Sequence, residues 1–488
     1  MKKLIVLMLA ALLLVAGCTP QIATEPTQAP ATEEPQLTEA SEFTAHYTDA
    51  RAKYAYIYEN ERDRKWEEDV VYFANQLLDP YNGHPMLSDR LTMTTTYNDL
   101  VARYSTTSSE NYFDPALKEA FIAGINELIP DIPELSDAGI AFRLQKLIMP
   151  LNDVHTGCNF FSLPIKLFPF DMLEPIKIDG AYEAVVFRAT EDCRDILGLR
   201  LKAVNGLPLD EIVERLTAYV PGETEDCSTI TIIRGYISMP DALREIGVMG
   251  DEDTAVFIFA DADGNETTRE LTAADEPEPA DVVYYRGDEE FSPADFRLMS
   301  SDKSVKAWYK LLSGGEALYF RLNTCMVDDS FPALVEEAFA KAAETGKLKK
   351  VIVDFRHNGG GYLDLYEGFL PLANAMRDSG AELYVMIDGL SFSASVGIPS
   401  LLKRRIEGVT LVGAPGGQPV RFFYGGYAGS FTLPNSGLYF GYSRIYGDFW
   451  PDYGDGALMP DVMAEQTYED YVAGIDTALN CVLFCGGN

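Results

Sequence analysis

Three short polar segments, far apart in the chain, contain residues suited to nucleophilic catalysis. The first is centred on Ser393, which lies between a strand-like apolar run and a helix-like segment. A serine at such a turn places its hydroxyl near a helix N-terminus, where backbone N–H groups stabilise developing negative charge. Ser391 and Ser395 compete for the role of nucleophile, and an ordinary serine N-cap is the structural alternative.

The second segment is a run of three glycines that follows the strand-like residues 351–353. It reads Asn358-Gly359-Gly360-Gly361. Glycines allow backbone N–H groups to come close to a ligand, as an oxyanion hole requires. The alternative is a tight turn without a ligand. The spacing is not that of a phosphate-binding loop, which argues against nucleotide binding.

The third segment is Asp153-Val154-His155-Thr156. Histidine can act as a general base near neutral pH, although a single histidine is more often structural. The chain has only four histidines, so any metal site or histidine-based catalysis must use this small set. The cysteine spacings fit no metal pattern, and we expect neither a metal nor a cofactor.

The elements around these segments predict a parallel sheet. Two apolar runs, 351–353 and 383–387, each end in an unusual turn and lead into a helix-like segment. A strand over 315–322 and an amphipathic helix over 330–345, ending at Gly346, precede them. This order predicts right-handed crossovers in a mainly parallel α/β sheet. The glycine run and Ser393 should then lie at the same edge of that sheet.

The rest of the chain predicts two further regions in an α/β, mixed α+β multidomain protein. Residues 43–157 show helical periodicity, with Asp114 and Ser136 as helix caps. Residues 158–300 are rich in short strands. Within them, residues 198–212 resemble the hairpin and helix of PDZ-like modules, and an unrelated hairpin with an Asn-Gly turn fits nearly as well. Residues 301–488 form the α/β core.

The N-terminus indicates export. A basic start, an apolar stretch over residues 4–15 and the sequence Leu14-Val15-Ala16-Gly17-Cys18 form a short secretory signal. The last five residues resemble the lipobox of bacterial lipoproteins, in which the cysteine is lipidated. Residues 1–18 would therefore be the signal peptide and residues 19–42 a flexible tether. We expect the protein on the outer side of a bacterial cell membrane, anchored through lipid on Cys18.

The charge and the remaining cysteines set further limits. The formal net charge of −36 argues against binding nucleic acid or an anionic bilayer surface through charge. Six cysteines remain after Cys18, and their spacing assigns no disulfide.

Together, the three polar segments resemble the serine peptidase family that includes tricorn core protease, the C-terminal-processing peptidases and the interphotoreceptor retinoid-binding protein repeats. The family patterns D-x-H-T, D-x-R-x-N-x-G-G and S-A-S occur here in family order, at 153–156, 354–361 and 393–395. Segments 459–462 and 474–479 resemble the closing P-D-[IV] and G-x-D-x-x-L. The resemblance covers about residues 65–480. It implies a crotonase-like core and peptide-bond hydrolysis through an acyl-enzyme.

The family has two catalytic versions. Processing peptidases pair the serine with a lysine about 25 residues later, where this chain has Gln418, and Lys403 is the last lysine. The resemblance therefore implies the tricorn-like version, with Ser393 as nucleophile and His155 as base. Gly359, Gly360 and Ala394 would form the oxyanion hole. The orienting carboxylate would be Asp455 or Asp452, although the family glutamate has no clear match, and Val396 replaces another family glutamate.

The leading hypothesis is a lipid-anchored, extracytoplasmic serine peptidase that acts on peptides or proteins. A peptide-binding or ligand-binding lipoprotein on the same fold is the alternative, favoured by the missing lysine and the unmatched glutamate. A third possibility is a solute-binding lipoprotein that serves a transporter. That class has two similar α/β lobes, whereas this sequence predicts a helical front, a β-rich middle and one α/β region.

Overall fold

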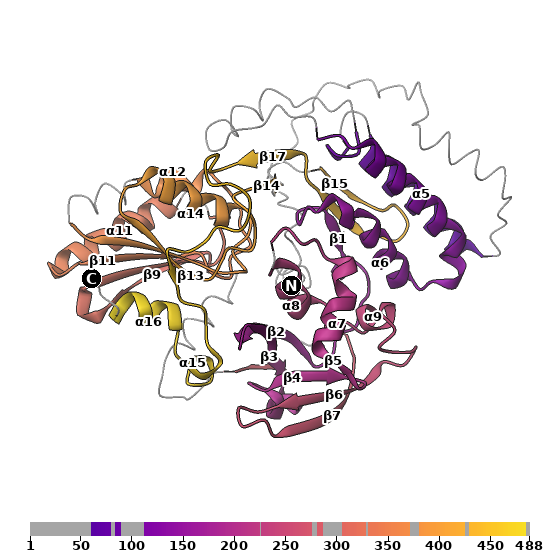
Figure 1. Cartoon of the computed structure of the whole chain (residues 1–488), viewed down its shortest axis with the longest axis horizontal. Helices are drawn as coiled ribbons and strands as arrows, with labels where there is room; N and C mark the ends of the chain where they lie inside the picture. The colour runs from indigo at the N-terminus through magenta and orange to yellow at the C-terminus, as the bar shows by residue number, and fades with distance from the viewer. Residues whose placement is uncertain are drawn as a thin grey trace.

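The computed structural model describes residues 60–79, 83–88, 112–224, 226–275, 281–285, 305–327, 330–370, 380–424 and 429–484. Cys18 and the expected tether lie outside these residues. Helices and several sheets are combined, which confirms a mixed α/β multidomain architecture (Figure 1). Within the part of the chain that is described, no helix has the length and apolar character needed to cross a membrane.

The first helices begin at the caps that the sequence predicts. The N-terminal helices are α3 (Glu61–Leu78), α5 (Pro115–Asp131) and α6 (Asp137–Ile148). The Asp114 carboxylate accepts the N–H of Ala116 at 2.9 Å, and the Ser136 hydroxyl accepts that of Gly139 at 3.0 Å. Each cap satisfies an N–H group that lacks a partner inside its helix, so these local residues fix where the helices start.

The middle region contains a seven-stranded sheet. Its main path is β2 (Phe170–Ile178), β3 (Ala181–Thr190), β4 (Arg200–Val204), β6 (Thr254–Ala260) and β7 (Glu266–Thr272), with β5 (Leu207–Pro208) on β4 and β8 (Val282–Tyr284) on β3. Asn205 and Gly206 join β4 to β5 with φ values of 48° and 82°, as an Asn-Gly hairpin turn requires. Helix α7 (Leu209–Leu216) follows. The expected hairpin and helix are thus present, and their assignment to a PDZ-like module stays a proposal.

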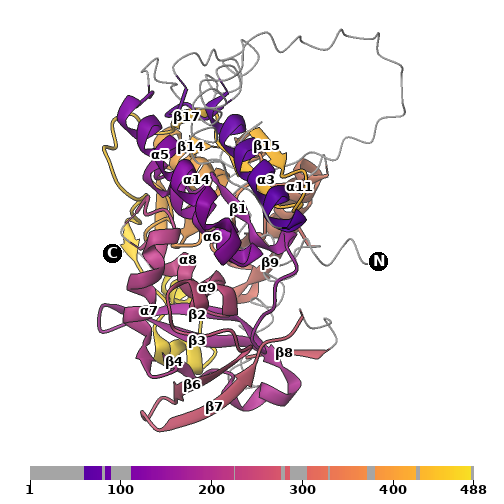
Figure 2. The same ribbon diagram turned by 90° about the vertical axis from the view of Figure 1, so that its right-hand side faces the viewer.

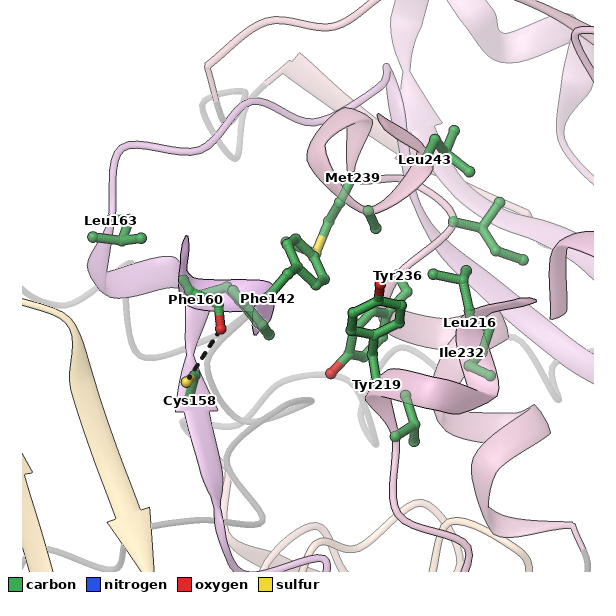
Figure 3. Close-up of a cluster of buried hydrophobic side chains, with 14 of the residues drawn as sticks. Phe142, Cys158, Phe160, Leu163, Leu216, Tyr219, Ile232, Tyr236, Met239 and Leu243 are labelled. Atoms are coloured by element: carbon green, nitrogen blue, oxygen red, sulfur yellow. Dashed lines mark hydrogen bonds between the residues drawn. The ribbon is translucent and has the colours of Figure 1, made fainter. Parts of the chain in front are cut away.

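The helical and β-rich regions share an apolar core. Phe142 of α6 stacks on Phe160, just after β1 (Gly157–Asn159), with ring centroids 4.4 Å apart. Tyr219 and Tyr236 meet the Phe142 ring edge-on from the side of α8 (Cys227–Gly235) and α9 (Pro240–Glu245). Figure 3 shows these side chains converging, with the Cys158 thiol hydrogen-bonded to the Ala141 carbonyl. This core is continuous across the two regions and includes Cys158 of β1, the strand that directly follows the His155 turn.

The C-terminal region is a mainly parallel sheet, as the sequence predicts. Its strand order is β18 (Val462–Met463), β13 (Val409–Gly413), β12 (Glu382–Ile387), β11 (Lys350–Asp354), β10 (Ala317–Leu322) and β9 (Ala307–Leu312). Only the β9–β10 pair is antiparallel among these neighbours.

Helices cover both faces of this sheet (Figure 1). Helices α11 (Phe331–Thr345), α12 (Leu365–Gly368) and α14 (Ala394–Arg405) lie on one face, and α16 (Thr477–Phe484) lies on the other. Val351 and Val353 pack toward the first face, and Ile352 packs toward the second. This alternation is the period of two expected for a strand that is buried on both sides.

One segment of the C-terminal region returns to the N-terminal helices. Strands β14 (Arg421–Tyr424) and β17 (Ile445–Asp448) pair with each other, and between them β15 (Gly429–Thr432) and β16 (Tyr439–Tyr442) form a sheet with β1. Phe440 of β16 packs edge-on against Phe73 of α3, with centroids 4.8 Å apart. In both views β15 lies beside the first helices, at the end of the molecule opposite the seven-stranded sheet (Figures 1 and 2).

Candidate active site

Ser393 lies at the turn from β12 to α14 in a rare backbone conformation. Its φ and ψ are 56° and −122°, and its side chain makes no capping hydrogen bond to the helix. A non-glycine residue with these dihedrals is strained, and such strain concentrates at functional sites. The same type of sharp strand-to-helix turn exposes the nucleophilic serine of α/β-hydrolases. Ser393 therefore does not act as the ordinary N-cap that the sequence left open.

The two competing serines are buried, and their hydroxyls are hydrogen-bonded to backbone carbonyls. The Ser391 hydroxyl donates to the Phe355 carbonyl at 3.0 Å. The Ser395 hydroxyl donates to the carbonyls of Phe392, at 2.7 Å, and Asn358. Neither side chain is exposed, whereas Ser393 is partly accessible. Of the three serines, only Ser393 can meet a substrate without rearrangement of the turn.

The glycine run lies directly against Ser393, at the sheet edge where the sequence predicts it. Gly360 has φ 96°, and a Cβ at this position would come within 2.6 Å of the Ser393 Cβ. The Gly360 N–H already donates to the Asn358 side chain at 2.8 Å. The N–H of Ala394, the first residue of α14, has no partner among the described residues. Gly359 is exposed on the same loop.

His155 is buried, and its imidazole ring makes no hydrogen bond to the described residues. Its imidazole stacks on Phe422 of β14, with centroids 5.7 Å apart and planes 7° apart. Neither ring nitrogen has a hydrogen-bond partner within the described part of the chain, so the ring is not hydrogen-bonded to Ser393. Burial lowers the pKa of His155, and the Asp153 carboxylate and the nearby Phe423 backbone, which does not meet hydrogen-bond geometry, offset this only in part. The neutral form, which can accept a proton, is therefore favoured.

Asp153 is the carboxylate closest along the chain to His155. Its Oδ1 lies 3.8 Å from the His155 Nδ1, and it accepts the His155 backbone N–H at 2.9 Å. Its Oδ2 accepts the Thr156 hydroxyl at 2.5 Å and faces the His84 Nε2 at 3.3 Å. His84 Nδ1 accepts the Met86 N–H, so the Nε2 of His84 carries the proton and donates to Asp153. The D-x-H-T segment thus forms one buried polar turn.

Gln418 and Glu223 connect the serine turn to the histidine turn. The Ser393 N–H donates to the Gln418 Oε1 at 2.5 Å, and the Gln418 Nε2 donates to the Glu223 Oε2 at 2.6 Å. The other Glu223 oxygen accepts the Val154 N–H at 2.8 Å. Burial, with a smaller contribution from the Asp153 charge, raises the pKa of Glu223 to about 8. Gln418, at the position of the family lysine, therefore touches the site through its amide.

The structure does not bring Asp455 to the histidine. Its side chain is 93% exposed and pairs with Arg421, and Asp452 is exposed as well. The carboxylates beside His155 are instead Asp153 and Glu223. Glu223 lies in a short acidic loop that no motif in the sequence marks, so only the three-dimensional contact reveals it.

Two of the sequence motifs meet in a buried charge network. Asp354 pairs with Arg321 at 2.8 Å and with Arg356 at 2.7 Å, and Arg356 also reaches Asp476 at 2.7 Å. Burial raises the pKa of Asp354, but the two guanidinium groups outweigh it and hold that pKa well below its usual range. This network fixes the strand that carries the glycine loop.

Comparison with solved structures shows that this chain shares its fold with a known protein. No protein-family model and no curated protein matches the sequence. Mature chlamydial CPAF in complex with lactacystin matches with a TM-score of 0.53 and 13% identity, over 85% of this chain and 97% of that chain. Mature CPAF alone gives a TM-score of 0.52 and 12% identity, over 85% and 95% of the two chains.

A photosystem II D1 C-terminal processing protease also matches, with 14% identity over 84% of this chain and 94% of that chain. Its TM-score of 0.35 is too low to support an inference. The similarity to CPAF shows the fold alone, because the identity is low. At that level it confirms the resemblance seen in the sequence: this chain has the overall fold of CPAF.

Proposed function

We propose that this protein is a serine peptidase in which Ser393 is the nucleophile and His155 the base. The observation that carries the proposal is the strained, partly exposed Ser393 at the strand-to-helix turn, with Gly360 packed against it. CPAF, whose fold this chain shares, is a tail-specific protease. Peptides or protein segments are therefore the proposed substrates.

The chemistry follows from the positions of the groups. The Ser393 Oγ would attack the carbonyl carbon of the scissile bond while His155 takes the serine proton. The Ala394 N–H at the start of α14 would stabilise the oxyanion. The exposed loop at Gly359 is the proposed source of a second backbone N–H donor. His155 would then return the proton to the leaving amine, and water would release the acyl group. Because Asp153 faces Nδ1, Nε2 is the nitrogen assigned to the serine.

In the described conformation His155 is not hydrogen-bonded to Ser393, so a rearrangement must bring them together. Catalytic hydrogen bonds are often long before substrate binds, so the missing hydrogen bond alone does not exclude the mechanism. It does favour a second candidate function, a peptide-binding protein on the same fold that does not cleave its ligand. The two functions differ in one measurable property, the reactivity of the serine.

Labelling of the full chain in detergent with a fluorophosphonate probe tests this proposal. We expect covalent labelling of the wild type, loss of labelling in Ser393→Ala, and a decrease of at least about 100-fold in rate in His155→Ala. Ser391→Ala and Ser395→Ala are matched controls and should retain labelling, because these hydroxyls are buried. Unlabelled wild type would instead favour the binding protein, and labelled Ser393→Ala would show that another residue is the nucleophile.

We also propose that the protein is exported and anchored through lipid on Cys18, outside the described residues. The short signal and its terminal cysteine support this. Metabolic labelling of cells with an alkyne fatty acid should mark the wild type and not Cys18→Ala.

A further inference from the structure

Three side chains in the site have the chemistry and spacing of metal ligands. Asp153, His155 and Glu223 each offer one ligand atom, and these atoms lie within 4.8 Å of one another. Asp153 and His155 are buried, and Glu223 is partly buried. Two carboxylates facing one another away from water repel, and a bound cation would remove that repulsion.

His155 gives a second and independent indication. The residue is 4% exposed, yet both its ring nitrogens are without hydrogen-bond partners among the described residues. Buried polar atoms in proteins are nearly always paired, so an unpaired imidazole points to a missing partner. Its Nδ1 lies 3.8 Å from the Asp153 Oδ1. That separation is too long for a hydrogen bond and close to the edge of about 3.4 Å between ligands of a tetrahedral zinc ion.

The carboxylates are held by surrounding donors, as metal-binding carboxylates are. On Asp153, Oδ2 is fixed by Thr156 and His84, while Oδ1 faces the His155 ring. On Glu223, the Val154 N–H and the Gln418 amide fix the two oxygens. Each oxygen keeps a lone pair, so coordination requires no loss of these hydrogen bonds.

We propose that Asp153, His155 and Glu223 bind one zinc ion. Calcium and magnesium prefer sites made only of oxygen ligands, whereas zinc combines imidazole nitrogen with carboxylate oxygen. Two carboxylates and a neutral imidazole balance the charge of a divalent ion. Three protein ligands leave a fourth position for water. The sequence predicted no metal, because Glu223 lies in a distant loop without a ligand motif.

A regulatory consequence rests on the proposed function. Zinc bound to Nδ1 would leave the imidazole proton on Nε2, the nitrogen that must take the Ser393 proton. The zinc-bound protein therefore cannot activate Ser393, and zinc binding and acylation of the serine exclude each other.

Titration of zinc chloride into the metal-free full chain, followed by isothermal calorimetry, tests the site. We expect one zinc per chain, and affinity at least about tenfold weaker in His155→Ala and in Glu223→Gln. Glu245→Gln removes another largely buried carboxylate, which pairs with Arg143 and Tyr219, and should bind zinc as the wild type does. Circular dichroism confirms folding of each variant. The proposal is overturned if no stoichiometric zinc site is found, or if both ligand variants bind zinc with the wild-type affinity.

Fluorophosphonate labelling with and without one equivalent of zinc separates this inference from the proposed function. Labelling only in the metal-free protein supports both. A zinc site lost in the variants, with a serine that never labels, keeps the site and removes the peptidase. Labelling without any zinc site keeps the peptidase and overturns the site. Labelling unchanged by bound zinc overturns the exclusion.

Discussion

Gly360 packs so closely against Ser393 that no side chain fits between them. The strained serine turn leaves space for a residue without a side chain, and Gly360 fills it with a positive φ. The Phe392 carbonyl and the Ala394 N–H would lie 2.7 and 2.9 Å from a Cβ at this position, so backbone and not a flexible side chain would have to move.

Gly360→Ala should therefore damage the serine turn. We expect fluorophosphonate labelling to fall by at least about 100-fold, because the added methyl displaces Ser393 and the Ala394 N–H. Gly264→Ala is the matched control. Gly264 has φ 84°, and no atom lies within 4 Å of the added carbon. The alanine there therefore has only the cost of placing a side chain at positive φ, about 1–2 kcal/mol. Labelling by Gly360→Ala at the wild-type rate would contradict the proposed placement of the nucleophile.

Asp354 should make stability depend on pH. Asp354→Asn leaves Arg321 and Arg356 with an uncompensated buried charge, and we expect a loss of about 3–5 kcal/mol in the free energy of unfolding at pH 7. The folded pKa of Asp354 is depressed, so its stabilisation is complete above the unfolded value of about 3.9 and decreases as pH falls toward the folded value.

The difference between wild type and Asp354→Asn should narrow by about 1 kcal/mol between pH 7 and pH 3 in urea denaturation. Asp455→Asn, in which the lost carboxylate is exposed, should change neither stability nor labelling. A gap that is constant with pH would mean that the pKa of Asp354 is the same in the folded and the unfolded protein.

At this scale the sequence predicted residue identities better than their roles. Ser393, Gly360 and His155 are marked by motifs, because special backbone and special chemistry restrict the residues allowed. The sequence assigned the orienting carboxylate to Asp455, which the structure places on the surface beside Arg421, since exposure is not visible in a sequence. Glu223 and His84 carry no local signal at all, because their importance comes only from what the fold brings beside them.

The strand β14 supports both buried histidines of the site. Phe422 lies flat against the His155 ring, and the neighbouring Phe423 packs against His84 with centroids 5.4 Å apart. Phe449 supports Phe422 from behind at 5.1 Å. An element of four residues thus sets the orientation of the proposed base.

Phe422→Leu tests this role of β14. The flat ring is lost while much of the apolar volume remains, so His155 loses its planar support with a moderate stability cost of about 1 kcal/mol. We expect labelling to slow by about tenfold. Phe449→Leu has a similar packing cost and does not touch His155, so it should label at close to the wild-type rate. Equal rates in the two variants would show that β14 does not orient the histidine.

Elements with strong local signals were predicted well. The capped helices, the β11–β12 pair and the crossover helices follow from periodicity and from single residues such as Gly346, which ends α11 with φ 61°. The β15–β16 hairpin was not predicted. Its partners lie nearly 300 residues earlier, and alternating apolar residues do not say which strand they will pair with.

At the scale of the whole molecule, Asp69 joins helix α3 to the β15–β16 hairpin. Its carboxylate is buried and accepts the N–H groups of Asn435 at 2.9 Å and Ser436 at 2.7 Å. Because β14 leads into the same hairpin, the contact also ties the position of Phe422 to the N-terminal helices.

Asp69→Ala should therefore lower stability and reactivity together. Removing the charged acceptor leaves two backbone N–H groups without their partner, and we expect a loss of roughly 2–3 kcal/mol in urea denaturation. Labelling should decrease as well, because the hairpin and β14 loosen. Glu61→Ala on the same helix removes an exposed carboxylate paired with Lys65 and should have little effect on either quantity. Full labelling in a destabilised Asp69→Ala would separate the hairpin from the site.

The return of β14–β17 to the first helices sets an order of events during synthesis. A growing chain presents Asp153, His155 and Glu223 before the ribosome has made Ser393, Gln418 or Phe422. Strand β1 also lacks its partner β16 until residue 442 has been added. The proposed reactive centre consequently cannot form early in synthesis. The proposed site can form only when nearly all of the polypeptide is present, so we expect an incomplete or truncated product to be inert.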